Sequence, residues 1–191
     1  MKIAVFMGGT SSEKEISLRS GEAVLESLQR QGYDAYGVVL DENNQVTAFL
    51  ENDYDLAYLV LHGGNGENGK IQAVLDILGK KYTGSGVLAS ALTMDKNKTK
   101  QIAENIGIRV PKSYRDLDSI ERFPVIIKPV DEGSSKGLFL CNNKEEAGEA
   151  LKKLRKPISE DYIVGEELTV GVLNGKALGV LKIIPQADVL Y

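Results

Sequence analysis

The segment from His62 to Gln72 carries residue types that can approach and bind an anion. His62 is the one histidine of the chain, and it is followed by a loop with four glycines and then by a helical pattern. Glycines let the backbone come close to a ligand, and the free N–H groups at a helix start can bind an anion. The alternative is a flexible loop beside a hydrogen-bonded core histidine. Because His62 ends a predicted strand, we favour the binding site.

A second glycine-containing turn, Gly8-Gly9, is followed by a carboxylate that the local structure does not require. Ser12 and Glu15 have the spacing of a helix capping box, which leaves Glu13 without a structural task. Ligands of open α/β sheets bind outside the carboxyl ends of the strands, and Glu13 is expected there. Its carboxylate suits a substrate ammonium group. From this segment alone, the helix cap is the better-supported interpretation.

Two lysines lie at positions that a bound anion would account for. Lys96 belongs to the first turns of a helix that Asp95 is predicted to cap, where a cation opposes the helix dipole by about 0.3–1 kcal/mol. Lys128 interrupts the apolar run 125–130, and Pro129 also permits an edge position in a sheet. A solvated helix end and an edge strand are the alternatives to phosphate binding.

A Gly/Ser-rich loop and an acidic segment follow. The loop Asp131–Gly137 joins two predicted strands, and its N–H and hydroxyl groups can fold over a phosphate. It is not a Walker motif, because the Gly-Lys-Ser order and the following helix are missing. In isolation it reads as an ordinary hairpin connection. The carboxylates of residues 160–170 can accept hydrogen bonds from an adenine amino group or from ribose hydroxyls, although surface charge is the simpler interpretation.

The first half of the chain alternates between strand and helix. Apolar runs predict strands at 3–7, 36–40 and 55–62, and apolar stripes of helical spacing lie at 21–28 and 71–78. This alternation predicts an open, Rossmann-like α/β sheet over residues 1–93.

From residue 94 the pattern changes to an α+β unit, residues 94–191. A helix is expected between Asp95 and Gly107, and a second one carries an apolar face over 147–154. Short strands are predicted at 125–130, 138–141, 168–173 and 177–184. Asn174-Gly175 between the last two is a strong hairpin signal.

Composition narrows the classes of protein. The chain has 191 residues, 42% hydrophobic and 26% charged, which excludes a disordered or collagen-like protein. No apolar run reaches the ~18 residues of a membrane span, so we expect no membrane partner. A net charge of −4 and the lack of tryptophan argue against nucleic acid as a partner. The single cysteine, Cys141, excludes an internal disulfide and favours a cytoplasmic location.

Taken in order, these segments resemble the D-alanine–D-alanine ligases of the ATP-grasp superfamily. His62–Gln72 fits the specific signature H-G-x-x-G-E-[DN]-G. The other matching segments are the family's opening, its domain junction and its phosphate loop: Gly8–Ser17, Thr83–Gly86 with Met94–Lys96, and Lys128–Gly137. The resemblance covers the whole chain and implies an α/β substrate-binding domain followed by an ATP-grasp central subdomain, truncated at its C-terminal end.

The resemblance also implies roles for named residues. Glu13 would hold the ammonium of the first D-alanine, His62 would stabilise the acyl phosphate, and Ser134 would position the second substrate. The residues implied for ATP are Lys96, Lys128 and Ser135 at the phosphates, Glu160 with the backbone of Asp161 and Ile163 at adenine, and Glu167 at the ribose. No metal ligand is assigned in this chain. The Mg²⁺ ligands are expected in a C-terminal part that family members carry beyond the matched region.

The function so implied is the ATP-dependent joining of two D-alanines through a D-alanyl phosphate, for peptidoglycan precursor synthesis. The implied partners are D-alanine, ATP and a second copy of the chain, paired through the N-terminal domain. Two alternatives stay open: a D-alanine–D-lactate or D-alanine–D-serine ligase of the same family, and a non-catalytic nucleotide-binding fragment.

Overall fold

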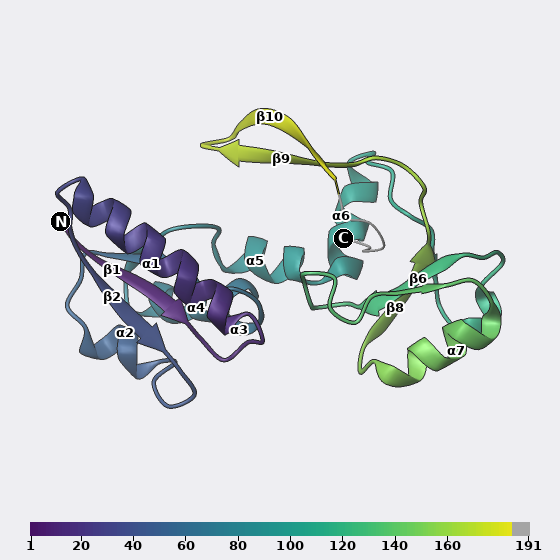
Figure 1. The fold of residues 1–191 in the computed structure, drawn as a ribbon, viewed down its shortest axis with the longest axis horizontal. Helices are drawn as coiled ribbons and strands as arrows, with labels where there is room; N and C mark the ends of the chain where they lie inside the picture. Colours follow the sequence, from purple (N-terminus) through teal and green to yellow (C-terminus); the bar gives the residue numbers. More distant parts are fainter. Residues whose placement is uncertain (185–191) are drawn as a thin grey trace. The chain divides into compact units, whose positions relative to one another are not determined.

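The computed structural model describes residues 1–184, which fall into two compact units (Figure 1). The first unit is Met1–Ile102, and the second begins at Ala103. Among the described residues, no helix combines the length and the apolar character needed to cross a membrane.

The first unit is built on a parallel sheet with the strand order β2-β1-β3-β4. Its strands are β1 (Lys2–Gly8), β2 (Asp34–Leu40), β3 (Leu56–Leu59) and β4 (Lys81–Tyr82). The predicted open α/β sheet is confirmed. The predicted strand 55–62 is too long, because pairing stops at Leu59 and His62 lies in the loop that follows.

Helices cover both faces of this sheet. Helix α1 (Lys14–Arg30) packs on one face, and α2 (Thr47–Glu51) and α4 (Lys70–Ile77) pack on the other. The remaining helices before residue 106 are α3 (Gly64–Glu67), α5 (Val87–Met94) and α6 (Lys96–Asn105). On one face, Phe6 packs with Phe49 of α2 and Leu75 of α4, and all three are fully buried. On the other face, Val5 packs beneath α1. Burial of each of these side chains stabilises the fold by about 1.5–3 kcal/mol. Because side chains pack on both faces of β1, this strand lies at the centre of the core.

Helix α1 lies unusually close to β1 at Gly21. A Cβ atom on Gly21 would lie 2.5 Å from Cβ of Met7, well inside the separation that two carbon atoms tolerate. Glycine is therefore required there by the close approach of helix and strand.

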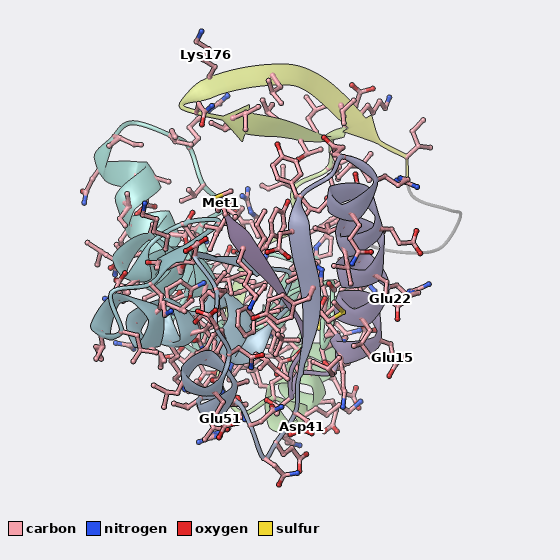
Figure 2. The ribbon with its side chains drawn as sticks, turned by 90° about the vertical axis from the view of Figure 1, so that its left-hand side faces the viewer. Met1, Glu15, Glu22, Asp41, Glu51 and Lys176 are labelled. Atoms are coloured by element: carbon pink, nitrogen blue, oxygen red, sulfur yellow. The ribbon has the colours of Figure 1, made fainter. Side chains whose placement is uncertain are left out.

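The predicted capping box at the start of α1 is wrong. The helix begins at Lys14 with Glu13 as N-cap, one residue later than the box requires, and no side chain caps it. Instead, Ser11 Oγ accepts a hydrogen bond of 3.1 Å from the backbone N–H of Glu13. Glu15, which was expected to reach back to the cap, points outward from the helix (Figure 2).

The second unit contains an antiparallel sheet with the strand order β5-β8-β6-β7. Its elements are β5 (Ser113–Tyr114), the 3-10 helix η1 (Leu117–Ser119), β6 (Val125–Pro129), β7 (Phe139–Cys141), α7 (Lys144–Lys153) and β8 (Pro157–Asp161). The small residues Ala147 and Ala150 of α7 pack on Val125, Ile127 and Cys141 of the sheet. Strand β6 lies between β8 and β7, but its pairing with β7 ends at Ile127, so Lys128 pairs with β8 alone and occupies an edge position on the β7 side.

A two-stranded hairpin completes the described fold. Its strands are β9 (Glu167–Leu173) and β10 (Lys176–Ile183), joined at Asn174 and Gly175. Both turn residues have positive φ angles, 51° and 75°, which is the backbone that a two-residue hairpin turn needs. The predicted hairpin is confirmed.

Candidate functional site

The loops that follow β1 and β3 are held together by a buried serine of α1. Ser17 Oγ accepts a hydrogen bond of 2.8 Å from the Gly8 N–H and donates one of 2.5 Å to the Val60 carbonyl. Ser17 is fully buried, so these bonds are shielded from water. They fix the carboxyl ends of two neighbouring strands relative to each other.

A second serine brings Glu13 and His62 to the same place. Ser11 Oγ donates a hydrogen bond of 2.5 Å to the His62 carbonyl while it accepts the Glu13 N–H. The loop after β1 is thus joined to the loop after β3 next to both predicted site residues. The sequence analysis missed Ser11 and Ser17, because their partners at His62 and Val60 are 51 and 43 residues away.

The Glu13 carboxylate packs directly on the glycine-rich loop. A Cβ atom on Gly63 would lie 2.7 Å from Glu13 Oε2, and the φ angle of Gly63 is +65°. The positive φ favours glycine at this position, and an added Cβ would displace the Glu13 carboxylate, which is the end of a flexible side chain. The glycine signature around His62 therefore makes room for a carboxylate, which the sequence analysis did not foresee.

His62 has an unsatisfied ring nitrogen. Its Nδ1 lies 3.7 Å from Glu67 Oε1, whereas its Nε2 is buried and has no hydrogen-bond partner among the described residues. A buried polar atom without a partner costs about 1–3 kcal/mol. Nε2 is therefore placed to bond a polar ligand atom. Glu67, which the sequence analysis did not single out, faces the other ring nitrogen.

Two hollows open at this edge of the sheet. A small one, about 20 Å³, is lined by residues that include Gly9, Ser11, His62 and Asn65. A more open one, about 240 Å³, is lined by the loops after β1 and β2: Gly9, Thr10, Ser11, Lys14, Asp41, Glu42 and Asn43. Asp41 lies at the end of β2 in Figure 2. The larger hollow has room for a small polar molecule, whereas the smaller one has room for about one water.

In the second unit, Lys128 forms an ion pair with Glu160. The two residues lie on the adjacent strands β6 and β8, where Ile126 is the direct partner of Glu160. The Glu160 side chain is 7% exposed and that of Lys128 is 24% exposed, so the pair is largely removed from water. A lysine held this way can meet a phosphate, and a carboxylate beside it can accept an amino hydrogen.

Asp161, the last residue of β8, is buried and accepts hydrogen bonds from two side chains. Tyr114 Oη donates at 2.6 Å and Arg122 Nε at 3.2 Å, and a second guanidinium nitrogen contacts the other carboxylate oxygen. The hydrogen bonds from Arg122, and next those from Tyr114, hold the pKa of Asp161 below its usual value. The same contact with Asp161 raises the pKa of Tyr114. The sequence analysis assigned only the Asp161 backbone and missed these partners.

The remaining predicted residues lie in exposed segments or at a helix start. Ser134 and Ser135 have φ angles of 52° and 54°, a backbone that costs about 1–2 kcal/mol for residues with a side chain. Ile163 is exposed after β8, and Glu167 begins β9. Lys96 is the first residue of α6, where the predicted cap is confirmed: Asp95 Oδ1 accepts the Lys98 N–H at 3.1 Å.

The ten predicted site residues are divided between the two units. Glu13, His62 and Lys96 belong to the first, and Lys128, Ser134, Ser135, Glu160, Asp161, Ile163 and Glu167 belong to the second. The structure brings together Glu13 with His62, and Lys128 with Glu160. Within residues 1–184, no group of three or more His, Cys, Asp or Glu side chains is arranged to hold a metal ion.

Comparison with known proteins identifies the family. The family model described as D-ala D-ala ligase N-terminus matches residues 2–50 and 44–85, and the one described as D-ala D-ala ligase C-terminus matches residues 81–191. A D-alanine–D-alanine ligase of Fusobacterium nucleatum is 87% identical over 191 residues, which are 100% of this chain and 67% of that protein. The ligase of Aquifex aeolicus is 41% identical over 99% of this chain and 68% of its own length.

Solved structures agree with the sequence relatives. A D-alanine–D-alanine ligase from Bacillus anthracis matches with a TM-score of 0.87 at 34% identity, over 95% of this chain and 64% of its own. The same enzyme complexed with ATP gives a TM-score of 0.86 at 33% identity, over 98% and 67%. The chain thus spans about two thirds of the length of its relatives. These matches and the ATP-grasp fold of the neighbours establish that the chain belongs to the D-alanine–D-alanine ligase family.

Proposed function

We propose that the chain supplies the D-alanine-binding and ATP-binding parts of a ligase that joins two D-alanines for peptidoglycan precursor synthesis. The observation that carries this proposal is the Glu13 carboxylate packed on Gly63 beside the unsatisfied Nε2 of His62. A carboxylate and a ring nitrogen at one sheet edge match the two charged groups of a small amino acid. In this assignment, residues 1–93 bind the amino acid and residues 94–191 bind the nucleotide.

In the first domain, Glu13 binds the ammonium of the first D-alanine. His62 Nε2 contacts its carboxylate and stabilises the acyl phosphate that forms there. Neutralising charge at the reacting carboxylate lowers the barrier to phosphoryl transfer. Ser11 supports both residues, because its hydroxyl bonds the backbone of each.

In the second domain, Lys128 binds the ATP phosphates, as does Lys96 at the start of α6. Ser135 closes the loop 131–137 over a phosphate. Glu160 and the backbone of Asp161 and Ile163 read adenine, and Glu167 binds the ribose. The Lys128–Glu160 pair supports this arrangement, because the ion pair holds the Lys128 ammonium, which is 24% exposed, in a fixed place beside a buried carboxylate.

The reaction then has two steps. A carboxylate oxygen of the first D-alanine attacks the γ-phosphorus of ATP, which gives D-alanyl phosphate and ADP. The amine of the second D-alanine, positioned by Ser134, attacks the acyl carbon, and phosphate leaves as a proton is lost from nitrogen. Positioning supplies most of the rate gain in such a sequence.

Magnesium, which usually accompanies ATP, finds no matching donor set in the described residues. Residues 1–184 hold no cluster of carboxylates suited to a hard cation. We further propose a cytoplasmic location and a homodimer paired through the first domain. Ile77 and Leu88, which are 85% and 71% exposed on α4 and α5, support such a contact.

The proposal is tested by titrating the 191-residue chain with D-alanine and, separately, with ATP. We expect Glu13→Gln to lower D-alanine affinity about 10- to 100-fold, the worth of a charge-assisted hydrogen bond, and to leave ATP affinity unchanged. Glu15→Gln is the matched control, since this exposed carboxylate lies two residues away on the same helix. Failure of the wild-type chain to bind D-alanine would overturn the proposal.

Two alternative functions can be distinguished by their products: a non-catalytic fragment makes none, and a D-lactate or D-serine ligase makes a different one. The absence of a metal-binding cluster from residues 1–184 favours a non-catalytic nucleotide-binding role for this stretch of chain. Incubation with ATP, magnesium and D-alanine separates this role from ligation, because only ligation yields dipeptide. Addition of D-lactate or D-serine as the second substrate, followed by mass analysis, separates the depsipeptide and mixed dipeptide from D-alanyl-D-alanine.

A further inference from the structure

Asp161 is a buried carboxylate at the centre of a hydrogen-bond network that the proposed reaction does not use; its partner Arg122 is 69% exposed. The Asp161 side chain is 5% exposed and receives hydrogen bonds from Tyr114 of β5 and from Arg122, which precedes β6. These partners are 47 and 39 residues away in the sequence. One carboxylate therefore joins three separate segments of the second unit.

Backbone hydrogen bonds also hold the chain in place at Asp161. The Asp161 N–H donates to the Lys112 carbonyl at 2.9 Å, and the Tyr162 N–H donates to the Pro124 carbonyl at 3.4 Å. Asp161 also pairs with Val125 as the last register position between β8 and β6. Immediately beyond this point the chain becomes exposed, with Ile163 60% accessible. The network thus fixes the last ordered strand position before an exposed segment.

We infer that Asp161 is a positioning residue, which through Arg122 and Tyr114 orients the backbone after β8 for recognition of a nucleotide base. This inference rests on the proposed function, in which the backbone of Asp161 and Ile163 reads adenine. Backbone N–H and C=O groups recognise a base through directional hydrogen bonds, so an error of about 1 Å in their placement weakens binding. Arg122 lies at the entry to β6, so the same network ties the base-reading segment to the strand that carries Lys128.

The charges around Asp161 favour its ionised form. Arg122 bonds it directly, and Lys112 faces it from the start of β5 while bonding Glu121 at 2.6 Å. Tyr114 contributes a neutral donor. An ionised carboxylate accepts all of these bonds at once, whereas an amide at the same place offers a single acceptor oxygen.

The test separates the base from the phosphates of the nucleotide. The affinity of the 191-residue chain is measured for ATP, for adenosine and for inorganic triphosphate, in wild type and in Asp161→Asn. We expect Asp161→Asn to weaken adenosine and ATP about fivefold, in the range of coupling that a residue outside the ligand contact transmits, and to leave triphosphate unchanged. A merely structural role would lower the affinity for all three ligands together.

Two further variants guard against a general loss of folding. Arg122→Lys keeps the charge and should recover part of the adenosine affinity relative to Arg122→Ala. Asp118→Asn removes an exposed carboxylate that pairs with Lys144, and should change none of the three affinities. If adenosine binds all variants within twofold of wild type, the inference fails. If the wild-type chain binds none of the three ligands, the proposed function fails instead.

Discussion

Replacing Lys128 by methionine should destabilise the second unit, because it removes a cation that pairs with the buried Glu160 carboxylate. Methionine preserves most of the side-chain length and apolar volume. Breaking a fully buried ion pair by removing one partner costs about 3–5 kcal/mol. The Lys128 side chain is 24% exposed, so water compensates part of the loss and we expect about 2–3 kcal/mol.

Amide hydrogen exchange measures this loss where it occurs. Amides of β6 and β8 report the opening of the second unit, while those of β1 belong to the first unit and should keep their protection. The chain has no tryptophan, so a fluorescence melt would not distinguish the units as directly. Lys152→Met is the matched control, because its partner Glu149 is exposed and the pair is worth less than about 1 kcal/mol.

A double substitution tests the reasoning itself. Glu160→Gln removes the buried charge, so Lys128→Met combined with Glu160→Gln should be more stable than Lys128→Met alone by about 1 kcal/mol or more. Two results would refute the argument: additive losses in the double variant, or a Lys128→Met variant that exchanges its β6 amides at the wild-type rate.

Three further outcomes are expected. Gly63→Ala should abolish detectable D-alanine binding, because the alanine Cβ would lie 2.7 Å from the Glu13 carboxylate. The control Gly79→Ala also has a positive φ angle, +63°, but open space around it, so it should lose only about 1–2 kcal/mol of stability. Titration measures D-alanine binding by the two variants, and urea unfolding measures their stability. Lys128→Ala should lower the affinity for ATP, measured by calorimetry, about tenfold or more. The loss should exceed that of Lys136→Ala, because Lys128 lies on a strand and Lys136 lies in a loop. Equal affinities of the two variants would contradict this prediction. The pKa of Asp161 is lowered in the folded chain, so its contribution to stability is complete above its usual value of 3.8 and is lost as the pH falls through the lower folded pKa. The difference in unfolding free energy between wild type and Asp161→Asn should therefore be constant between about pH 7 and about pH 5 and shrink below about pH 4.

The parallel sheet could be predicted because β1 and β2 are continuous apolar runs, although only β1 is buried on both faces and β2 alternates between buried and exposed residues. The runs at 3–7 and 36–40 match β1 and β2 closely, and the hairpin turn at Asn174-Gly175 was identified from its residue types alone. Short elements were missed. The helix Gly64–Glu67 contains two glycines and has the composition of a loop, so no local signal marks it.

The candidate site, too, could be predicted only in part from the sequence. Glu13, His62 and Lys128 could be named from residue type, position after or within a strand, and resemblance to a family. Their supports could not, because hydrogen bonds such as Ser11 to His62 and Arg122 to Asp161 join residues that are 51 and 39 positions apart. Single-sequence periodicity describes neighbours within one element and contains no information on such pairs.

The close contact between Gly21 and Met7 limits the substitutions that the protein can accept at position 21. Cβ of Met7 is fixed to the strand and cannot turn away, so any larger residue at position 21 must push α1 outward by about 1 Å to reach an ordinary carbon–carbon separation. A helix of 17 residues moves as a rigid rod, and its N-cap is Glu13. A substitution in the core, two turns away from the site, would then shift the carboxylate away from Gly63. Under the proposed role of Glu13, amino-acid binding depends on a position that touches no ligand, and we expect position 21 to accept nothing but glycine.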